Sequence, residues 1–309
     1  MTGLSEEDKR EMLRQVRRIE VRTDRMVTDV MAGGYTSVFR GAGIEFDEVR
    51  EFAPGDEIRS VDWNVTARTG KPYVKKFMEE RELTVMLVLD VSASTVFGTQ
   101  PVARPDAERA RSVRETAAIV CGCFAFAAAR NNDKAGMITF TDRIERYVPA
   151  KKGRRHVLRL IREAYAQEHE GGGTDLGQAL DYAGRIQRRR AVVFVIGDFF
   201  GPVPERQLKV LARRHDVIAV RIRDPHSETL PAAGLLHLRD PETGVTVAVD
   251  TSSKRVRTAI AARVQQERQQ LQDVCRRAGV DLLDVPTRGS VSDPIVRFFR
   301  MRERRGSRR

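Results

Sequence analysis

The stretch LTVMLVLDVSAST, residues 83–95, decides the fold class of this chain. Its first eight residues are almost all apolar, which is typical of a β-strand covered on both faces. The run ends on Asp90, and two hydroxyls, Ser92 and Ser94, follow at alternate positions. This spacing places three oxygen-bearing side chains on one side of a tight loop, and oxygens are the ligands that Mg²⁺ prefers. The alternative is a turn in which these side chains bond nearby backbone.

The same alternation of apolar strand and amphipathic helix continues to about residue 286. We expect further strands at 134–140, 191–198, 217–224 and 280–286, and helices ending near Asn131 and spanning about 154–167, 204–214 and 254–278. A hairpin over 235–250 is expected to turn around residues 241–244. The pattern predicts an α/β fold with an open, mostly parallel, doubly wound sheet and helices on both faces.

Two further loops are expected at the same edge of this sheet. Asp198 ends a buried strand, and Thr174 lies in the glycine loop GGGTD that opens a helix. Ligands of such sheets bind beyond the carboxyl ends of the strands. The candidate metal ligands are therefore Asp90, Ser92, Ser94, Thr174 and Asp198. The alternative is that Thr174 is only a helix N-cap and that the aspartates bond backbone amides.

The order and spacing of DVSAS (90–94), GGGTD (171–175) and VIGD (195–198) resemble the three loops of a von Willebrand factor A domain. In that family the loops form a metal-ion-dependent adhesion site. The resemblance implies that the hydroxyl-bearing residues supply neutral oxygens, while Asp90 and Asp198 hold Mg²⁺ or Mn²⁺ directly or through water. Two carboxylates balance one divalent ion, which keeps an open coordination position. A partner's Asp or Glu can fill that position, which makes a metal-bridged protein contact.

The segment before the first strand, residues 41–82, is dense in charge and contains the only tryptophan, Trp63. Its run EFDEVREFAPGDEIRSVDWNVTARTGKPYVKKF resembles the signature of the bacterial family called domain of unknown function 58. The resemblance implies a MoxR-type AAA+ ATPase as partner, with this chain as its adaptor. We expect four parts: a helical extension (1–40), the signature segment (41–82), a von Willebrand factor A-like domain (83–290) and a basic tail (291–309).

The net charge of +12 is concentrated at the C-terminus, because residues 297–309 carry seven arginines and one glutamate. Such a tail can bind nucleic acid or an anionic membrane surface. It is also compatible with a solvated end that binds nothing. Binding through this tail is the alternative to a metal-dependent protein contact.

The composition excludes several other classes. The apolar run 116–129 is too short to span a bilayer, and the charged N-terminus has no signal-peptide core, so we expect a cytoplasmic protein. Many members of the resembling family carry N-terminal membrane helices, which this sequence lacks. The histidines are scattered without the spacing of zinc ligands.

An enzymatic function is the third alternative. A phosphatase resembling the haloacid dehalogenases would need a second acid two positions after Asp90, and that position is Ser92. No motif with His, Cys or Lys lies nearby to move a proton. The sequence therefore favours a non-enzymatic interaction module over a metal-dependent hydrolase.

Overall fold

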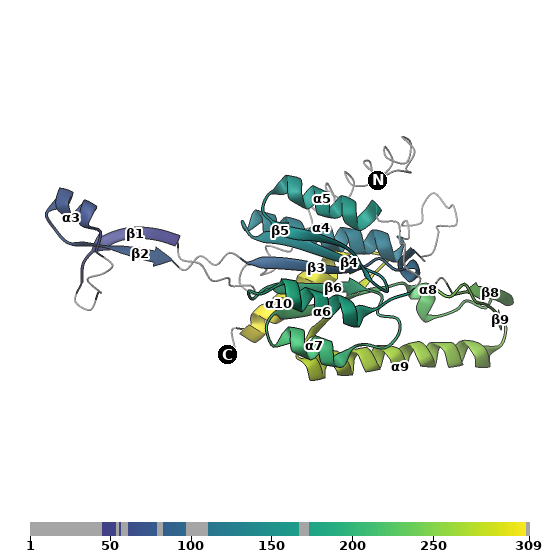
Figure 1. The fold of residues 1–309 in the computed structure, drawn as a ribbon. Helices are drawn as coiled ribbons and strands as arrows, with labels where there is room; N and C mark the ends of the chain where they lie inside the picture. The colour runs from purple at the N-terminus through teal and green to yellow at the C-terminus, as the bar shows by residue number, and fades with distance from the viewer. Residues whose placement is uncertain are drawn as a thin grey trace, which may run out of the picture. The chain divides into compact units, whose positions relative to one another are not determined.

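The computed structural model describes residues 45–53, 56, 61–78, 83–96, 111–166, 173–240 and 242–306. They belong to two compact units, one within residues 39–83 and the other beginning at Thr84. Figure 1 shows the ribbon with its element labels. The expected helical extension at 1–40 lies outside the described residues.

The smaller unit is a two-stranded antiparallel sheet with one short helix. β1 (Glu45–Glu51) pairs with β2 (Tyr73–Met78), and α3 (Trp63–Thr69) lies between them in the sequence. Asp62 caps α3 by accepting hydrogen bonds from two backbone N–H groups of its first turn. Trp63 is 66% exposed, so this unit does not bury the only tryptophan within itself.

The larger unit is built on one six-stranded sheet. Its strands are β3 (Thr84–Asp90), β4 (Lys134–Phe140), β5 (Ile144–Lys151), β6 (Val192–Gly197), β7 (Asp216–Arg223) and β10 (Asp281–Pro286). Their order across the sheet is β10-β7-β6-β3-β4-β5. All neighbours pair in parallel except β4 and β5, which are antiparallel. The predicted fold class, α/β with a mostly parallel sheet, is confirmed.

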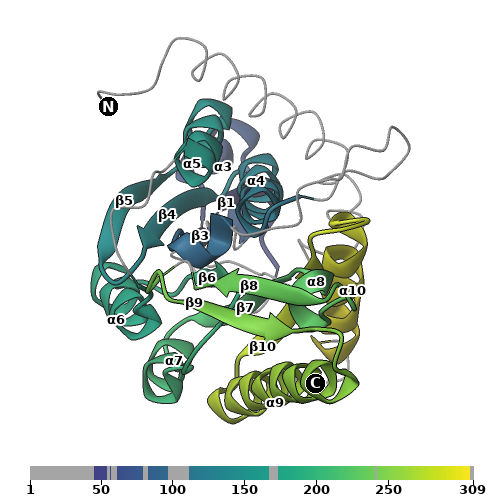
Figure 2. The same cartoon turned by 90° about the vertical axis from the view of Figure 1, so that its right-hand side faces the viewer.

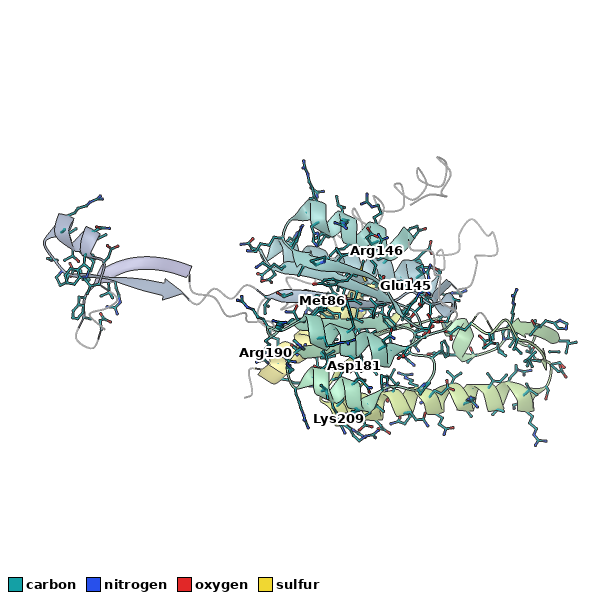
Figure 3. All side chains as sticks on the ribbon, in the orientation of Figure 1. Met86, Glu145, Arg146, Asp181, Arg190 and Lys209 are labelled. Carbon is teal, nitrogen blue, oxygen red and sulfur yellow. The ribbon has the colours of Figure 1, made fainter. Side chains whose placement is uncertain are left out.

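Helices cover both faces of this sheet (Figure 2). One face carries α4 (Val113–Arg130), α5 (Arg154–Ala166) and α10 (Ser292–Gly306), and the other carries α6 (Leu176–Ile186), α7 (Glu205–Ala212) and α9 (Lys254–Ala278). Shorter elements are the 3-10 turn η2 (Ala93–Val96), α8 (Pro225–Glu228) and the hairpin of β8 (Leu235–Arg239) and β9 (Thr246–Asp250). Apolar side chains fill both interfaces between sheet and helices. Met86 of β3 lies in the layer shared with α6 (Figure 3).

The basic C-terminal segment differs from the expected tail. Residues 292–306 form α10, whose Ile295, Phe298 and Phe299 are buried. Phe299 meets Phe124 of α4 edge to face, with ring centroids 6.2 Å apart. Arg302 donates from Nη2 to both carboxylate oxygens of Asp216 at 2.9 Å. Much of the terminal charge therefore belongs to a packed helix.

Within the described parts of the chain, no helix is both long and apolar enough to cross a membrane.

We predict that Phe299→Ala lowers the free energy of unfolding by about 3 kcal/mol or more, because it leaves a cavity under α10. Met301→Ala, on the exposed side of the same helix, should change it by less than about 0.5 kcal/mol. Chemical denaturation followed by circular dichroism measures both values. Tryptophan fluorescence would not report on α10, since the only tryptophan lies in the other unit. Equal effects of the two changes would show that α10 is not a core element.

Candidate metal centre

The candidate site begins where two neighbouring parallel strands end on acidic residues. Asp90 is the last residue of β3, and Asp198 directly follows β6. Leu89 pairs with Ile196, which brings Asp90 beside Gly197. A Cβ at Gly197 would lie 2.9 Å from the Cβ of Asp90, closer than real Cβ atoms approach. Only glycine therefore allows Asp90 to occupy this place.

This position is also where the order of the strands reverses. From β3 the chain passes first to β4 on one side, and later to β6 on the other. Loops at such a point leave the sheet in opposite directions and open a crevice for ligands. Asp90 and Asp198 are at that crevice, and both side chains are buried.

Each aspartate shapes its own loop through one oxygen. Asp90 Oδ1 accepts a hydrogen bond from the N–H of Ser92 at 2.8 Å, and Asp198 Oδ1 accepts one from the N–H of Phe200 at 3.1 Å. Part of the turn interpretation is therefore correct. Asp198 Oδ2, however, is buried without a hydrogen-bond partner. Phe199, which lies between Asp198 and Phe200, has a φ of 58°. This left-handed backbone conformation is rare for a residue with a side chain of this size.

The two serines lie together beside Asp90. Their Oγ atoms are 3.0 Å apart, and Ser92 is fully buried. The 3-10 turn η2 fixes the loop, because Thr95 donates from its hydroxyl to the carbonyl of Ser92 at 2.7 Å. Adjacent ligands of an octahedral Mg²⁺ are about 3 Å apart, since each Mg–O distance is close to 2.1 Å. The spacing of the serine hydroxyls fits that geometry.

Thr174 stands just before α6, but it is not the cap of that helix. The N-cap is Asp175, whose Oδ1 accepts from the N–H of Gln178 at 2.9 Å, so the N-cap interpretation of Thr174 is wrong. The Thr174 hydroxyl instead donates to Oε1 of Glu242 at 2.7 Å. Thr174 and Asp90 line one cavity of about 340 Å³, which places both at the same crevice.

Burial and like charge make this site unfavourable for carboxylates alone. Burial raises the pKa of Asp90 to about 7, and the charges of Asp198 and, less strongly, Glu242 add to that rise. Burial also raises the pKa of Asp198, although the Phe200 N–H and the Ser94 hydroxyl oppose the shift. A cation between the two aspartates would remove both penalties.

The donor set fits a hard divalent ion. No three His, Cys, Asp or Glu side chains among the described residues are placed to hold an ion by themselves. A metal site at this crevice therefore needs hydroxyl oxygens beside Asp90 and Asp198. Such an all-oxygen set suits Mg²⁺ or Mn²⁺ rather than Zn²⁺. An ion there would give Asp198 Oδ2 the partner that it lacks.

Three residues of the site are absent from the sequence-based candidates. Gly197 makes room for Asp90, and Glu242 holds Thr174. Arg114 of α4 donates from Nη2 to the backbone carbonyl of Val91 at 2.6 Å, which fixes the loop after β3. A glycine directly before a strand-end aspartate is a usable sequence signal. The other two contacts join segments far apart in the chain and leave no local pattern.

Comparisons with known proteins identify relatives without an assigned activity. A family model described as "Protein of unknown function DUF58" matches residues 48–270. Uncharacterized protein Rv1480 of Mycobacterium tuberculosis is 31% identical over 292 residues, which cover 94% of this chain and 89% of that protein. Uncharacterized protein Mb1516 of Mycobacterium bovis matches with the same identity and coverage.

One similar solved structure is that of the conserved hypothetical protein BatB from Bacteroides thetaiotaomicron. It is 17% identical, with a TM-score of 0.45, and the match covers 72% of this chain and 99% of that chain.

We predict that Asp198→Asn stabilises the metal-free protein at pH 8 by roughly 1 kcal/mol, the equivalent of about one pKa unit at Asp90. The change removes the repulsion on Asp90 and keeps an oxygen for the Phe200 N–H. Chemical denaturation in chelator measures it. Asp181→Asn, which removes an exposed carboxylate of α6, is the control and should have no comparable effect.

The stabilisation should depend on pH. The pKa of Asp90 is raised from 3.8 to about 7 in the folded state, so its contribution to stability is present below about pH 4 and lost as the pH rises to about 7. The advantage of Asp198→Asn should therefore shrink between pH 8 and pH 5. An advantage that is independent of pH would contradict this account.

Proposed function

The chain belongs to the DUF58 family of proteins of unknown function, and we propose that its larger unit is a metal-dependent protein-interaction module. The observation that carries the proposal is the buried pair Asp90 and Asp198, with Oδ2 of Asp198 unpartnered. Their combined charge matches one divalent ion, and Ser92, Ser94 and Thr174 would supply neutral oxygens. Mg²⁺ or Mn²⁺ is the proposed ion.

When bound, the ion would supply positive charge and one coordination position open to a ligand from outside. The chain's own residues set the rest of the contact. The turns at Ser92 and Phe200 aim the two aspartates, and η2 holds the serine hydroxyls in place. A partner's Asp or Glu is the group that fits the open position, because carboxylate oxygen is a ligand that a hard divalent ion prefers.

A hydrolase is a weaker proposal for the same site. The described residues that line the cavity include no His, Cys or Lys. Proton transfer would then fall to carboxylates that the ion already occupies. An interaction module requires no such group.

The partner that we propose is a MoxR-type AAA+ ATPase, which the family resemblance implies. The chain would act as its adaptor or as a subunit that recruits substrates. The ATPase or its substrate would offer the acidic side chain.

We predict that Asp90→Ala abolishes binding of Mg²⁺ and Mn²⁺ while the fold is kept. Titration calorimetry into metal-free protein measures the binding, and circular dichroism checks the fold. The same change, and separately a chelator, should remove the contact with the ATPase in a pull-down. If Asp90→Ala still binds Mg²⁺ or Mn²⁺, or if it still retains the ATPase in the pull-down, the proposal is wrong.

Gly197→Ala provides a companion variant that keeps every ligand. Its Cβ would displace Asp90, which lies against it. The affinity for Mn²⁺ should fall at least about tenfold, as it does when residues that orient metal ligands are changed. Gly184→Ala in α6 is the matched control, because its Cβ would meet Leu211 Cδ1 at 3.5 Å, an ordinary van der Waals distance.

Binding of an anionic surface through α10 is the second candidate function. Arg297, Arg300 and Arg304 recur on one exposed side of this helix, and together with Met301 they line a shallow groove. We predict that changing all three to Gln weakens binding to duplex DNA or anionic vesicles. If each contacts a phosphate of DNA, the slope of log affinity against log salt should decrease by about 3. An unchanged slope would exclude this face as the contact.

A further inference from the structure

The β8–β9 hairpin brings a third carboxylate to the candidate metal centre. The hairpin lies beyond the carboxyl ends of β3 and β6 (Figures 1 and 2). Glu242 in its turn accepts the hydrogen bond from the Thr174 hydroxyl at 2.7 Å. Gly173 lies next to this contact, since a Cβ there would be 3.8 Å from Oε2 of Glu242, an ordinary van der Waals distance.

The turn holds Glu242 in a defined position. The Asp240 carboxylate accepts from the N–H of Glu242 at 2.9 Å and from the hydroxyl of Thr243 at 2.6 Å. Gly244, with φ of 72°, donates its N–H to the carbonyl of Asp240 at 2.9 Å. These bonds fix the backbone of Glu242 within the turn. The Thr174 hydroxyl is the contact that holds the Glu242 carboxylate at the candidate metal centre.

The rest of the hairpin is lightly anchored. Its apolar side chains are largely in solvent, with Leu235 63% and Val247 54% exposed. At its base, Thr251 donates from both its N–H and its hydroxyl to the carbonyl of Gly234. An element with little buried surface and a fixed base can move at its tip without disturbing the core.

Glu242 lies beside the candidate metal centre, although Asp90, Asp198 and Glu242 do not by themselves form a group placed to hold an ion. The Glu242 oxygen and that of Thr174 are 2.7 Å apart, close to the roughly 3 Å between neighbouring ligands of an octahedral Mg²⁺. The charge of Glu242 also acts on the buried pair, Asp90 and Asp198. A third carboxylate destabilises this pair in the absence of a cation and strengthens the site in its presence. The unpartnered Oδ2 of Asp198 marks the same crevice as a place for a cation.

We propose that Glu242 is an intrachain ligand of the bound ion and occupies the coordination position that a partner's carboxylate would otherwise take. This inference rests on the metal site proposed above. With Glu242 bound to the ion, the tip of the hairpin blocks the position to which a partner's carboxylate would bind. A partner then binds by displacing Glu242, and the lightly anchored hairpin lets it do so.

The test compares the full chain with its Glu242→Gln variant, with Mn²⁺ alone as the probe. Calorimetry gives the dissociation constant, and water-proton relaxation reports how many exchanging waters the bound Mn²⁺ carries. We expect Mn²⁺ to bind Glu242→Gln about tenfold more weakly and to carry one more water. Added acetate should lower the relaxation in the variant and leave the wild type unchanged.

Two controls isolate the role of the carboxylate. Asp181→Asn removes an exposed charge of α6 (Figure 3) and should behave like the wild type. Glu242→Asp keeps the charge but draws it back by one methylene, so it should shift both readouts in the same direction as Glu242→Gln.

The possible outcomes separate this inference from the proposal beneath it. If the wild type binds Mn²⁺ and Glu242→Gln changes neither readout, the inference is overturned and the metal site stands. Weaker binding with unchanged relaxation would make Glu242 a positioning residue for Thr174, which also overturns it. If the wild type fails to bind Mn²⁺, or Asp90→Ala binds it equally well, the inference and the proposed function both fall.

Discussion

The close approach of β3 and β6 at Asp90 and Gly197 is the constraint on which the site depends. β3 is a central strand whose residues 85–90 are all buried, so a carboxylate at its end is largely withheld from water. The neighbouring strand ends at the same level and is followed by a second buried carboxylate, Asp198. Burying two like charges is unfavourable without a compensating cation. The fold thus fixes an arrangement that is poor for stability and suitable for holding a cation.

The local structure around these aspartates shows how the chain maintains that arrangement. Hydrogen bonds to backbone N–H groups fix one oxygen of each carboxylate, and η2 and Arg114 fix the loop after β3. The N–H groups are neutral, whereas the charge of Arg114, which donates to the backbone carbonyls of Val91 and Ser92, acts on Asp90. The contacts fix the direction of the carboxylates, and the pKa of Asp90 stays raised in spite of the nearby cation. Such pre-organisation is what a binding site requires.

The sequence was informative where a feature is local. The strand at 134–140 and the helix at 254–278 have the predicted bounds, because each follows from an uninterrupted pattern. The placement of Asp90 and Asp198 at neighbouring strand ends follows from the rules for parallel sheets. For α10, the count of arginines obscured a helical period, since Ile295, Phe298 and Phe299 recur at the spacing of one buried face.

Glu242 was not predictable for a different reason. The turn was expected from its proline and glycine, but Glu242 and Thr174 are 68 residues apart in sequence. Nothing in a polar turn distinguishes a solvated glutamate from one that reaches another loop. The signature segment before β3 is a similar case, because no local pattern distinguishes an exposed Trp63 from a buried one.

An internal carboxylate changes what a partner must provide. A ligand tethered through a short hairpin acts at an effective concentration of roughly millimolar or more, so a free carboxylate at lower concentration cannot replace it. Metal coordination alone would then give a partner little net affinity, because one carboxylate is exchanged for another. Selectivity would then come from contacts with the surface around the crevice, including the exposed apolar side chains of the hairpin itself. In the proposed complex, the ion would fix where the partner's acid binds, and the surrounding surface would decide which partner is bound.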